Sequence, residues 1–274
     1  MRVETVRQAL AAAATRLGFS ETPRLDAELL MAHALGVGRE QLLLRHLDDP
    51  APATFAALIE RRLAHEPVAY ITGRRDFWSI TLAVGPGVLI PRPDSETLIE
   101  AAVAHFTGRP PAMVIDLGTG PGTLLLAALA EWPEARGVGV DWSEQALSYA
   151  HKNAEALGMA DRVLLRRGDW ASGIAERFDL VLCNPPYIAA DEALPAEVRD
   201  HEPAAALFAG SDGLEDYGII AAQLPRLIAP GGMAAIEIGA TQAAAVTALL
   251  SAEGLNVALR HDLAGRDRCL VATP

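Results

Sequence analysis

Four consecutive residues, Asn184-Pro185-Pro186-Tyr187, combine groups that could hold a poorly nucleophilic nitrogen for a transfer reaction. The lone pair of an amide or exocyclic amine nitrogen is delocalised, so the reaction depends on positioning and on acceptors for the two hydrogens of that nitrogen. The side-chain oxygen of Asn184 is one acceptor, and the carbonyl of Pro185, whose direction the prolines restrict, is another. Tyr187 offers a ring face for a planar amide or base. We predict catalytic roles for Asn184, Pro185 and Tyr187, and contact with the substrate along the whole tetrapeptide.

A glycine-rich turn, Asp116-Leu117-Gly118-Thr119-Gly120-Pro121-Gly122, follows an apolar run and precedes a helical pattern. Glycines let a backbone approach a ligand closely, and a helix start adds N–H donors. The Gly-x-Gly-x-Gly spacing differs from that of pyrophosphate sites, and Asp116 would repel a pyrophosphate. Asp116 would instead attract a cation with an amino-acid tail. S-adenosylmethionine, which carries an ammonium and a sulfonium group, is such a cation. The predicted cofactor-binding residues of the turn are Asp116, Gly118, Thr119, Gly120, Pro121 and Gly122.

Two further strand ends carry side chains suited to the same ligand. Asp141 ends the next apolar run, where a carboxylate can accept hydrogen bonds from both ribose hydroxyls. Trp170 follows a third run and could bracket an adenine together with Asp169. Asp141 could instead cap the helix that starts at Ser143–Glu144, and Asn184-Pro185 could be a simple turn. The recurrence of such residues at successive strand ends favours one cofactor site, to which Asn184 would also contribute.

These residues require a parallel sheet, and the chain from Pro110 onward has the alternation of strands and helices that builds one. Apolar strands are expected at 112–116, 137–141, 163–166, 180–184, 233–238, 256–260 and 268–272, with helices at 124–131, 144–157, 219–228 and 242–251. Because ligands bind at the carboxyl ends of parallel strands, all the candidate residues would meet at one edge. The pattern predicts a doubly wound, Rossmann-like α/β sheet.

The first part of the chain predicts short helices instead. Val3, Val6, Leu10, Ala13 and Leu17 recur at helical spacing, which describes an amphipathic helix and not an export signal. A second helix begins at Thr22-Pro23 and ends at Gly36, a third covers 39–47, and a fourth begins near Pro52. From Asp76 to Ile90 the pattern becomes β-type, with a turn at Gly85-Pro86-Gly87. The expected domains are a helical substrate-docking domain (1–75), a β-hairpin linker (76–92) and a methyltransferase domain (93–274).

Composition excludes several other classes of protein. The net charge of −12 argues against a protein that binds chiefly by neutralising phosphates, so no direct binding of nucleic acid is expected. Arg61, Arg62, Arg74 and Arg75 could form a basic patch, although a solvated face is the simpler interpretation. Seven histidines and two cysteines show no ligand spacing, so no metal site is predicted. No apolar stretch reaches membrane-spanning length, and we expect a soluble cytoplasmic protein with reduced, buried thiols.

With both motifs placed, nearly the whole chain resembles the release-factor glutamine methyltransferases (PrmC/HemK family). The segments that carry the resemblance are Asp26–Leu30, Glu66–Gly73, Phe77–Ser79, Leu89–Pro93, Glu202-Pro203, Ala206–Gly210, Asp212–Leu214, Glu237–Gly239 and the two motifs above. The resemblance implies S-adenosylmethionine at Gly118–Gly122, Asp141, Trp170 and Asn184, and a substrate clamp at Asn184–Tyr187. It also implies, as substrate, the glutamine of the Gly-Gly-Gln loop of bacterial class I release factors.

Three departures from the family pattern stand near these sites: Pro121 lacks an N–H, Trp142 replaces an aliphatic residue, and Ser95 replaces the more common threonine. Asn-Pro-Pro-Tyr is shared with adenine-N6 methyltransferases of DNA or RNA, which remain an alternative. Glutamine methylation of a ribosomal protein is a closer alternative, and a non-catalytic binding module is a third.

Overall fold

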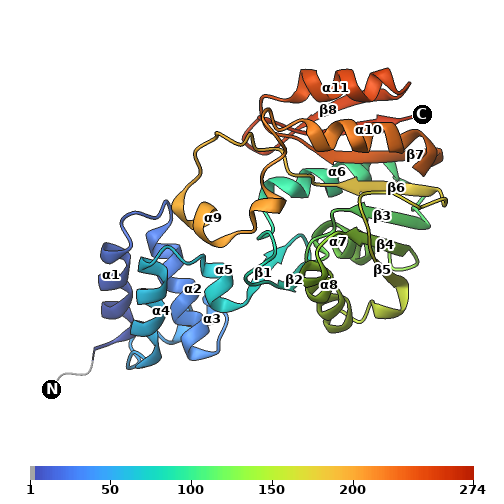
Figure 1. Ribbon diagram of the computed structural model, residues 1–274. Helices are drawn as coiled ribbons and strands as arrows, with labels where there is room; N and C mark the ends of the chain where they lie inside the picture. Colours follow the sequence, from blue (N-terminus) through green and yellow to red (C-terminus); the bar gives the residue numbers. More distant parts are fainter. Residues whose placement is uncertain (1–3) are drawn as a thin grey trace. The chain divides into compact units, whose positions relative to one another are not determined.

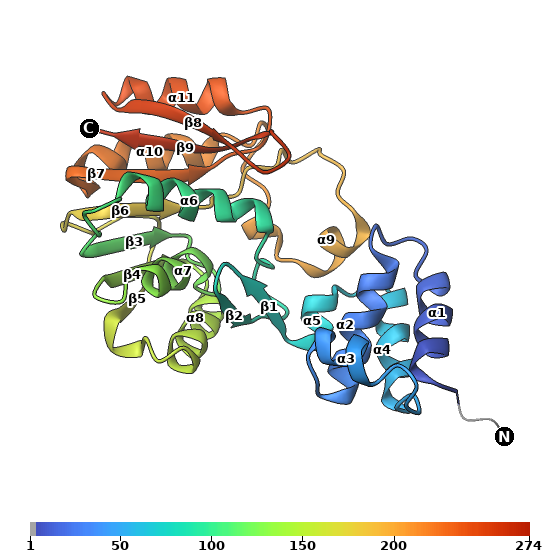
Figure 2. The ribbon, with the colours of Figure 1, turned by 180° about the vertical axis from the view of Figure 1, so that it is seen from behind.

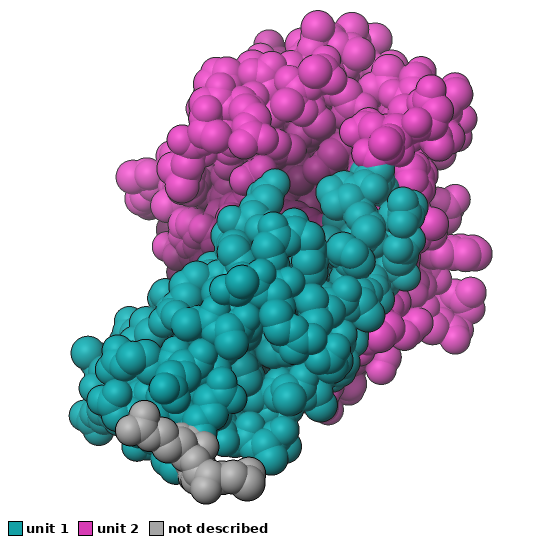
Figure 3. Space-filling model, turned by 90° about the vertical axis from the view of Figure 1, so that its left-hand side faces the viewer, with its two compact units in different colours: residues 1–74, 194–201 teal, residues 75–193, 202–274 magenta. Residues whose placement is uncertain are grey.

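The computed structural model describes residues 4–274, which divide into two compact units (Figure 3). Of the described residues, one unit comprises 4–74 and 194–201, and the other comprises 75–193 and 202–274. Val3, part of the expected first helix, lies outside the described residues. Within residues 4–274, no helix combines the length and apolar character needed to cross a bilayer.

The smaller unit is helical, and each helix begins and ends where local chemistry favours it. Its helices are α1 (Val6–Arg16), α2 (Pro23–Leu35), α3 (Arg39–Arg45), α4 (Thr54–Leu63), α5 (Val68–Thr72) and α9 (Ala196–His201). Thr5 and Gln8 form a capping box at the start of α1. Pro23 occupies the first turn of α2, and Gly36 ends that helix in the left-handed conformation, as the sequence predicted. Buried apolar side chains of α1, α2, α3, α4 and α5 form its core.

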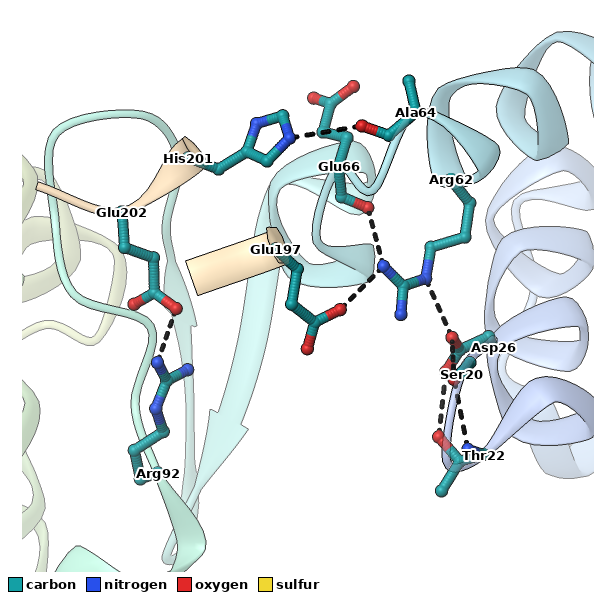
Figure 4. A network of polar contacts seen from close by, with 10 residues as sticks. All are labelled: Ser20, Thr22, Asp26, Arg62, Ala64, Glu66, Arg92, Glu197, His201 and Glu202. Atoms are coloured by element: carbon teal, nitrogen blue, oxygen red, sulfur yellow. Dashed lines mark hydrogen bonds and ion pairs between the residues drawn. The ribbon is translucent and has the colours of Figure 1, made fainter. Parts of the chain in front are cut away.

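Arg62 of α4 is buried in this unit, so the solvated-face interpretation was wrong for this residue. Its Nε donates to Asp26 Oδ2 over 2.9 Å, and its Nη1 lies 2.7 Å from Glu197 Oε2 (Figure 4). Asp26 also accepts hydrogen bonds from the hydroxyls of Ser20 and Thr22. The ion pair places α9 in the helical unit, although α9 follows Asn-Pro-Pro-Tyr in the sequence. The periodicity did not predict α9 or α5.

The larger unit contains a seven-stranded sheet in the order β5-β4-β3-β6-β7-β9-β8. Its strands are β3 (Met113–Leu117), β4 (Arg136–Asp141), β5 (Val163–Arg167), β6 (Phe178–Cys183), β7 (Ile228–Glu237), β8 (Asn256–His261) and β9 (Asp267–Thr273). Pairing is parallel from β5 to β7, and β9 is antiparallel to both of its neighbours. The chain order reverses between β3 and β6, so the carboxyl ends of these two strands flank a switch point.

Helices cover both faces of this sheet, as the alternating pattern predicted (Figures 1 and 2). They are α6 (Glu96–His105), α7 (Thr123–Glu131), α8 (Glu144–Ala156), α10 (Glu215–Leu227) and α11 (Ala243–Ala252). Helices α6 and α7 pack together, and α10 and α11 pack together, with α6 and α10 on opposite faces. Helix α6 was not among the helices expected from the sequence. Cys183 and Cys269 are both buried and free.

The hairpin overlaps only the first part of the segment predicted for it, 76–92, and its turn lies elsewhere than predicted. Strands β1 (Arg74–Phe77) and β2 (Ile80–Ala83) are joined at Trp78-Ser79, where Trp78 has a φ of 54°. The backbone N–H of Trp78 donates to Glu96 Oε1 over 2.8 Å, which stabilises a conformation that is rare for a bulky residue. Gly85-Pro86-Gly87 follows the hairpin. The prediction gave weight to glycine and could not take account of a carboxylate from α6.

Candidate active site

A cavity of about 430 Å³ lies in the larger unit at the carboxyl ends of the parallel strands. This volume is within the usual range for sites that hold a small ligand. The cavity brings together side chains or backbone from the ends of β3, β4, β5 and β6. The predicted site residues that line it are Asp116, Gly118, Thr119, Gly120, Asp141, Trp170, Asn184 and Pro186.

The glycine-rich turn folds back onto β4, which uses up most of its backbone donors. The amides of Gly118 and Thr119 both donate to Val140 O over 2.9 Å, and that of Gly120 donates to Asp141 Oδ2 over 2.8 Å. The amide of Gly122 donates to Thr119 O. The turn therefore gives a ligand close access to the backbone but few of the N–H donors that the sequence analysis expected from it.

Asp116 is the carboxylate buried beside this turn, with an exposed fraction of 1%. Its Oδ2 accepts hydrogen bonds from Thr119 Oγ1 at 2.7 Å and from Leu125 N at 3.2 Å. Its Oδ1 has no hydrogen-bond partner among the described residues. Burial raises the pKa of Asp116 to about 7. A buried acceptor without a donor is costly, so this wall of the cavity suits a cationic or N–H-bearing ligand.

Asp141 ends β4 on the same cavity. Its Oδ1 accepts a hydrogen bond from Ser143 N over 2.8 Å, and its Oδ2 accepts the bond from Gly120. Ser143 is the N-cap of α8, since its hydroxyl accepts from Ala146 N, so Asp141 is not the helix cap. Burial raises the pKa of Asp141. Each carboxylate oxygen has capacity for a further hydrogen bond, which matches a role toward ligand hydroxyls.

Trp170 has a φ of 48°, which is rare for a bulky side chain and is often found at functional sites. Its ring lies against Gly118, where an added Cβ would approach the ring to 3.2 Å. Its side chain also hydrogen-bonds to Asp216 of α10. Asp216 lines the cavity, and the sequence had suggested no role for it. The only signal in the sequence was the adjacent segment Asp212–Leu214, to which no role was given.

Asn184 follows directly after β6, and its side chain is held from one side. Its Nδ2 donates to Ser95 Oγ over 3.2 Å. Ser95 precedes α6, is 2% exposed, and also lines the cavity. Since the Nδ2 group is engaged there, the amide oxygen of Asn184 is the group left for other partners.

Four predicted site residues do not line the cavity: Pro121, Gly122, Pro185 and Tyr187. The carbonyl of Pro121 accepts a hydrogen bond from Asn153 Nδ2 over 2.8 Å. Gly122 has a φ of 88°, and a Cβ there would approach Leu126 to 2.8 Å. The Tyr187 hydroxyl donates to Glu237 Oε1 over 3.4 Å, and its carbonyl accepts from Gln242 Nε2. The geometry gives Pro121, Gly122 and Tyr187 supporting contacts.

Two of the segments singled out in the sequence meet beside the cavity. Glu202, which is 6% exposed, accepts a hydrogen bond from Ile90 N over 3.0 Å and lies 2.5 Å from Arg92 Nη2 (Figure 4). Arg92 and Pro203 both line the cavity. Glu202 therefore joins the stretch after the hairpin to the stretch after α9, and both contribute walls.

Known protein families match both parts of the chain. Residues 8–73 match the family described as PrmC N-terminal domain, and residues 110–259 match a methyltransferase domain. A protein of Cereibacter sphaeroides named release factor glutamine methyltransferase is 47% identical, over 96% of this chain and 96% of its own. One of the same name from Rhodospirillum rubrum is 45% identical over 92% of this chain and 79% of its own.

Solved structures match the larger part of the fold. The ribosomal protein L11 methylase of Lactobacillus delbrueckii subsp. bulgaricus has a TM-score of 0.52 and 19% identity, over 69% of this chain and 83% of that one. A 16S rRNA methyltransferase of Thermus thermophilus, solved with AdoMet and guanosine, has a TM-score of 0.51 and 21% identity. That match covers 73% of this chain and 49% of the other. At these identities the likeness shows a shared methyltransferase fold.

Proposed function

This chain belongs to the release factor glutamine methyltransferase family, and from that premise we propose its reaction. It transfers a methyl group from S-adenosylmethionine to the side-chain amide nitrogen (N5) of the glutamine in the Gly-Gly-Gln loop of bacterial class I release factors. Relatives that share this name along nearly the whole chain favour this substrate over adenine-N6 or a ribosomal protein. The observation that carries the proposal is that Asn184 lines the same cavity as Asp116 and Asp141.

The cavity residues fit the cofactor. Asp116 Oδ1, buried and without a partner among the described residues, suits the cationic amino-acid end, and Asp141 suits the ribose hydroxyls. Gly118 keeps the backbone free of a side chain next to Trp170, which suits the flat adenine. When bound, S-adenosylmethionine supplies a methyl group on a positively charged sulfur.

The residues of the chain then have to hold the acceptor nitrogen and its hydrogens. Asn184 Oδ1, on the cavity wall, accepts one N–H of the substrate amide. We assign the second N–H to the carbonyl of Pro185, the next residue of the motif, although Pro185 itself does not line the cavity. Pro186, on the cavity wall, excludes water beside the amide. Pre-formed acceptors favour the transition state because they need no reorganisation as the nitrogen gains positive charge.

The test is methylation of a purified release factor with isotopically labelled cofactor, with the modified residue located by mass spectrometry. The label is expected on the glutamine of Gly-Gly-Gln. Asn184→Ala should lower turnover by about 10²–10³-fold, the usual cost of one contact made in the transition state. Asn256→Ala, at an exposed asparagine of β8, is the matched control. Label on another residue, or near-normal turnover in Asn184→Ala, would contradict the proposal.

A further inference from the structure

Glu237 is a buried carboxylate to which the proposed reaction assigns no role. It is the last residue of β7 and is 1% exposed. The neighbouring strand β6 pairs with β7 up to Cys183 and Ile236, so Glu237 and Asn184 leave adjacent strands at the same level of the sheet. Glu237 does not line the cavity, and so any influence on the reaction must pass through another side chain.

Two side chains link Glu237 to the Asn-Pro-Pro-Tyr motif. The Tyr187 hydroxyl donates to Glu237 Oε1 over 3.4 Å. Glu237 Oε2 is buried and has no hydrogen-bond partner among the described residues, so it can accept from a hydroxyl that comes close to it. The nearby hydroxyl of Ser95 lowers the pKa of Glu237 against the effect of burial. Ser95 in turn accepts from Asn184 Nδ2 over 3.2 Å.

The number of hydrogens in this chain fixes its direction. An ionised carboxylate only accepts hydrogen bonds, and a serine hydroxyl has one hydrogen to donate. If Ser95 gives that hydrogen to Glu237, its oxygen can only accept from Asn184. Asn184 must then turn its NH₂ group toward Ser95, and its carbonyl oxygen is left for the cavity.

We infer that Glu237 is a positioning residue, which acts through Ser95 to hold the side-chain amide of Asn184 with its oxygen available to the substrate nitrogen. This role rests on the proposed function, since it concerns the acceptor used in that reaction. Protonated Glu237 could donate to Ser95, and Ser95 could then donate to Asn184. The opposite orientation of the amide, with NH₂ toward the cavity, would then be allowed.

The surroundings of Glu237 place this change near neutral pH. Burial raises the pKa of Glu237 to about 7, with Arg268 opposing that effect and Asp94 adding to it. The titratable and charged groups that face Glu237 come from η1 (Pro93–Ser95), β6 and the residues after it, α10 and β9: Asp94, Cys183, Tyr187, Tyr217, Arg268 and Cys269. The ionised, orienting form therefore prevails above pH 7, and turnover should fall as the pH drops through 7.

The test compares Ser95→Ala, Ser95→Thr and Glu237→Gln with wild type, with exposed Ser251→Ala and Glu253→Gln as matched controls. Ser95→Ala should lower kcat for a release factor by up to about a hundredfold, with smaller changes in KM and in calorimetric cofactor affinity. Ser95→Thr keeps the hydroxyl and should restore most of that loss. Glu237→Gln should lower kcat and remove its dependence on pH near 7. Wild-type kcat in Ser95→Ala would overturn the inference.

A second measurement follows the wild-type protein directly and does not depend on the identity of the substrate. The side-chain amide signals of Asn184, assigned by their loss in Asn184→Asp, can be followed by NMR between pH 5.5 and 8.5, a range spanning roughly 1.5 units either side of neutrality. They should shift with a midpoint near the pKa of about 7 that Glu237 has, and this shift should be absent in Glu237→Gln, where Asp116 with its similar pKa still titrates. Signals that do not titrate would overturn the inference. Failure of wild type to methylate a release factor, with titrating signals, would contradict the proposed function instead.

Discussion

Asp116 is a single residue whose charge state should change when the cofactor binds. In the free protein burial raises its pKa to about 7, and its Oδ1 has no partner within the described chain. A bound cation stabilises the ionised carboxylate and lowers that pKa, so binding at pH 7 should release roughly half a proton. Affinity should accordingly weaken as the pH falls below 7.

Calorimetry of S-adenosylmethionine binding in buffers of different ionisation enthalpy measures this release directly. Asp116→Asn cannot ionise, so it should bind more weakly and without the proton release. Glu237 has a similar raised pKa but does not line the cavity, and Glu237→Gln serves as the control. A binding enthalpy in wild type that does not depend on the buffer would contradict this prediction.

Asp141 has two roles at once, because its oxygens hold Gly120 and Ser143 while facing the cavity. Asp141→Ala removes hydrogen bonds to a charged acceptor, each of which contributes about 1.5–3 kcal/mol. We therefore expect the binding free energy of the cofactor to weaken by a few kcal/mol at most. Asp161→Ala, at an exposed position, should leave affinity unchanged. Titration calorimetry with equal affinities in the two variants would restrict Asp141 to a structural role.

At the scale of elements, loss of Arg62 should destabilise the helical unit far more than loss of Glu197, the residue of α9 with which Arg62 forms an ion pair. Side chains of Arg62 and Asp26 are 5% and 8% exposed, whereas that of Glu197 is 42% exposed. Arg62→Ala leaves the buried Asp26 without its cation and should cost about 3–5 kcal/mol of unfolding free energy. Glu197→Gln breaks a solvent-screened ion pair and should cost only about 0.2–1 kcal/mol.

Urea denaturation of the wild type, Arg62→Ala and Glu197→Gln gives these free energies of unfolding. The slope m of each curve shows whether the unfolded state has changed. Arg16→Ala removes a similar arginine whose ion pair with Glu60 is exposed, and is the control for loss of an arginine alone. Equal destabilisation by Arg62→Ala and Arg16→Ala would show that the buried network contributes little.

At the scale of the whole molecule, we propose that the helical part docks the release factor. All the residues that line the cavity belong to the larger unit. One glutamine side chain offers too little surface to select a protein, so selectivity needs a wider interface. Leu44 of α3, which is 82% exposed, and Phe19, which is 43% exposed, are apolar surface in the helical unit.

A chain that begins near Asp76 should still bind S-adenosylmethionine but should lose its preference for an intact release factor over a short Gly-Gly-Gln peptide. Rates on both substrates, with a melting curve of the truncated protein, test this expectation. The helices could serve stability alone, in which case truncation would unfold the protein. A folded truncation that methylates intact release factor at the full-length rate would refute the docking role.

The sequence alone determined the features that depend on neighbours along the chain. Alternating apolar runs predicted the parallel part of the sheet, and Asp116, Asp141 and Asn184 each lie at the carboxyl end of one of its strands, so topology alone brings them to one edge. Thr22, Pro23 and Gly36 set the bounds of α2 by their own backbone preferences.

Only the tertiary structure decided which side chains meet across long stretches of chain. Arg92 and Glu202 are 110 positions apart, Ser95 and Asn184 are 89 apart, and Arg62 and Asp26 are 36 apart. No periodicity or motif encodes such pairs, because each depends on burial that several packed elements create together. The hairpin turn at Trp78 has the same cause, since Glu96 of α6 fixes it.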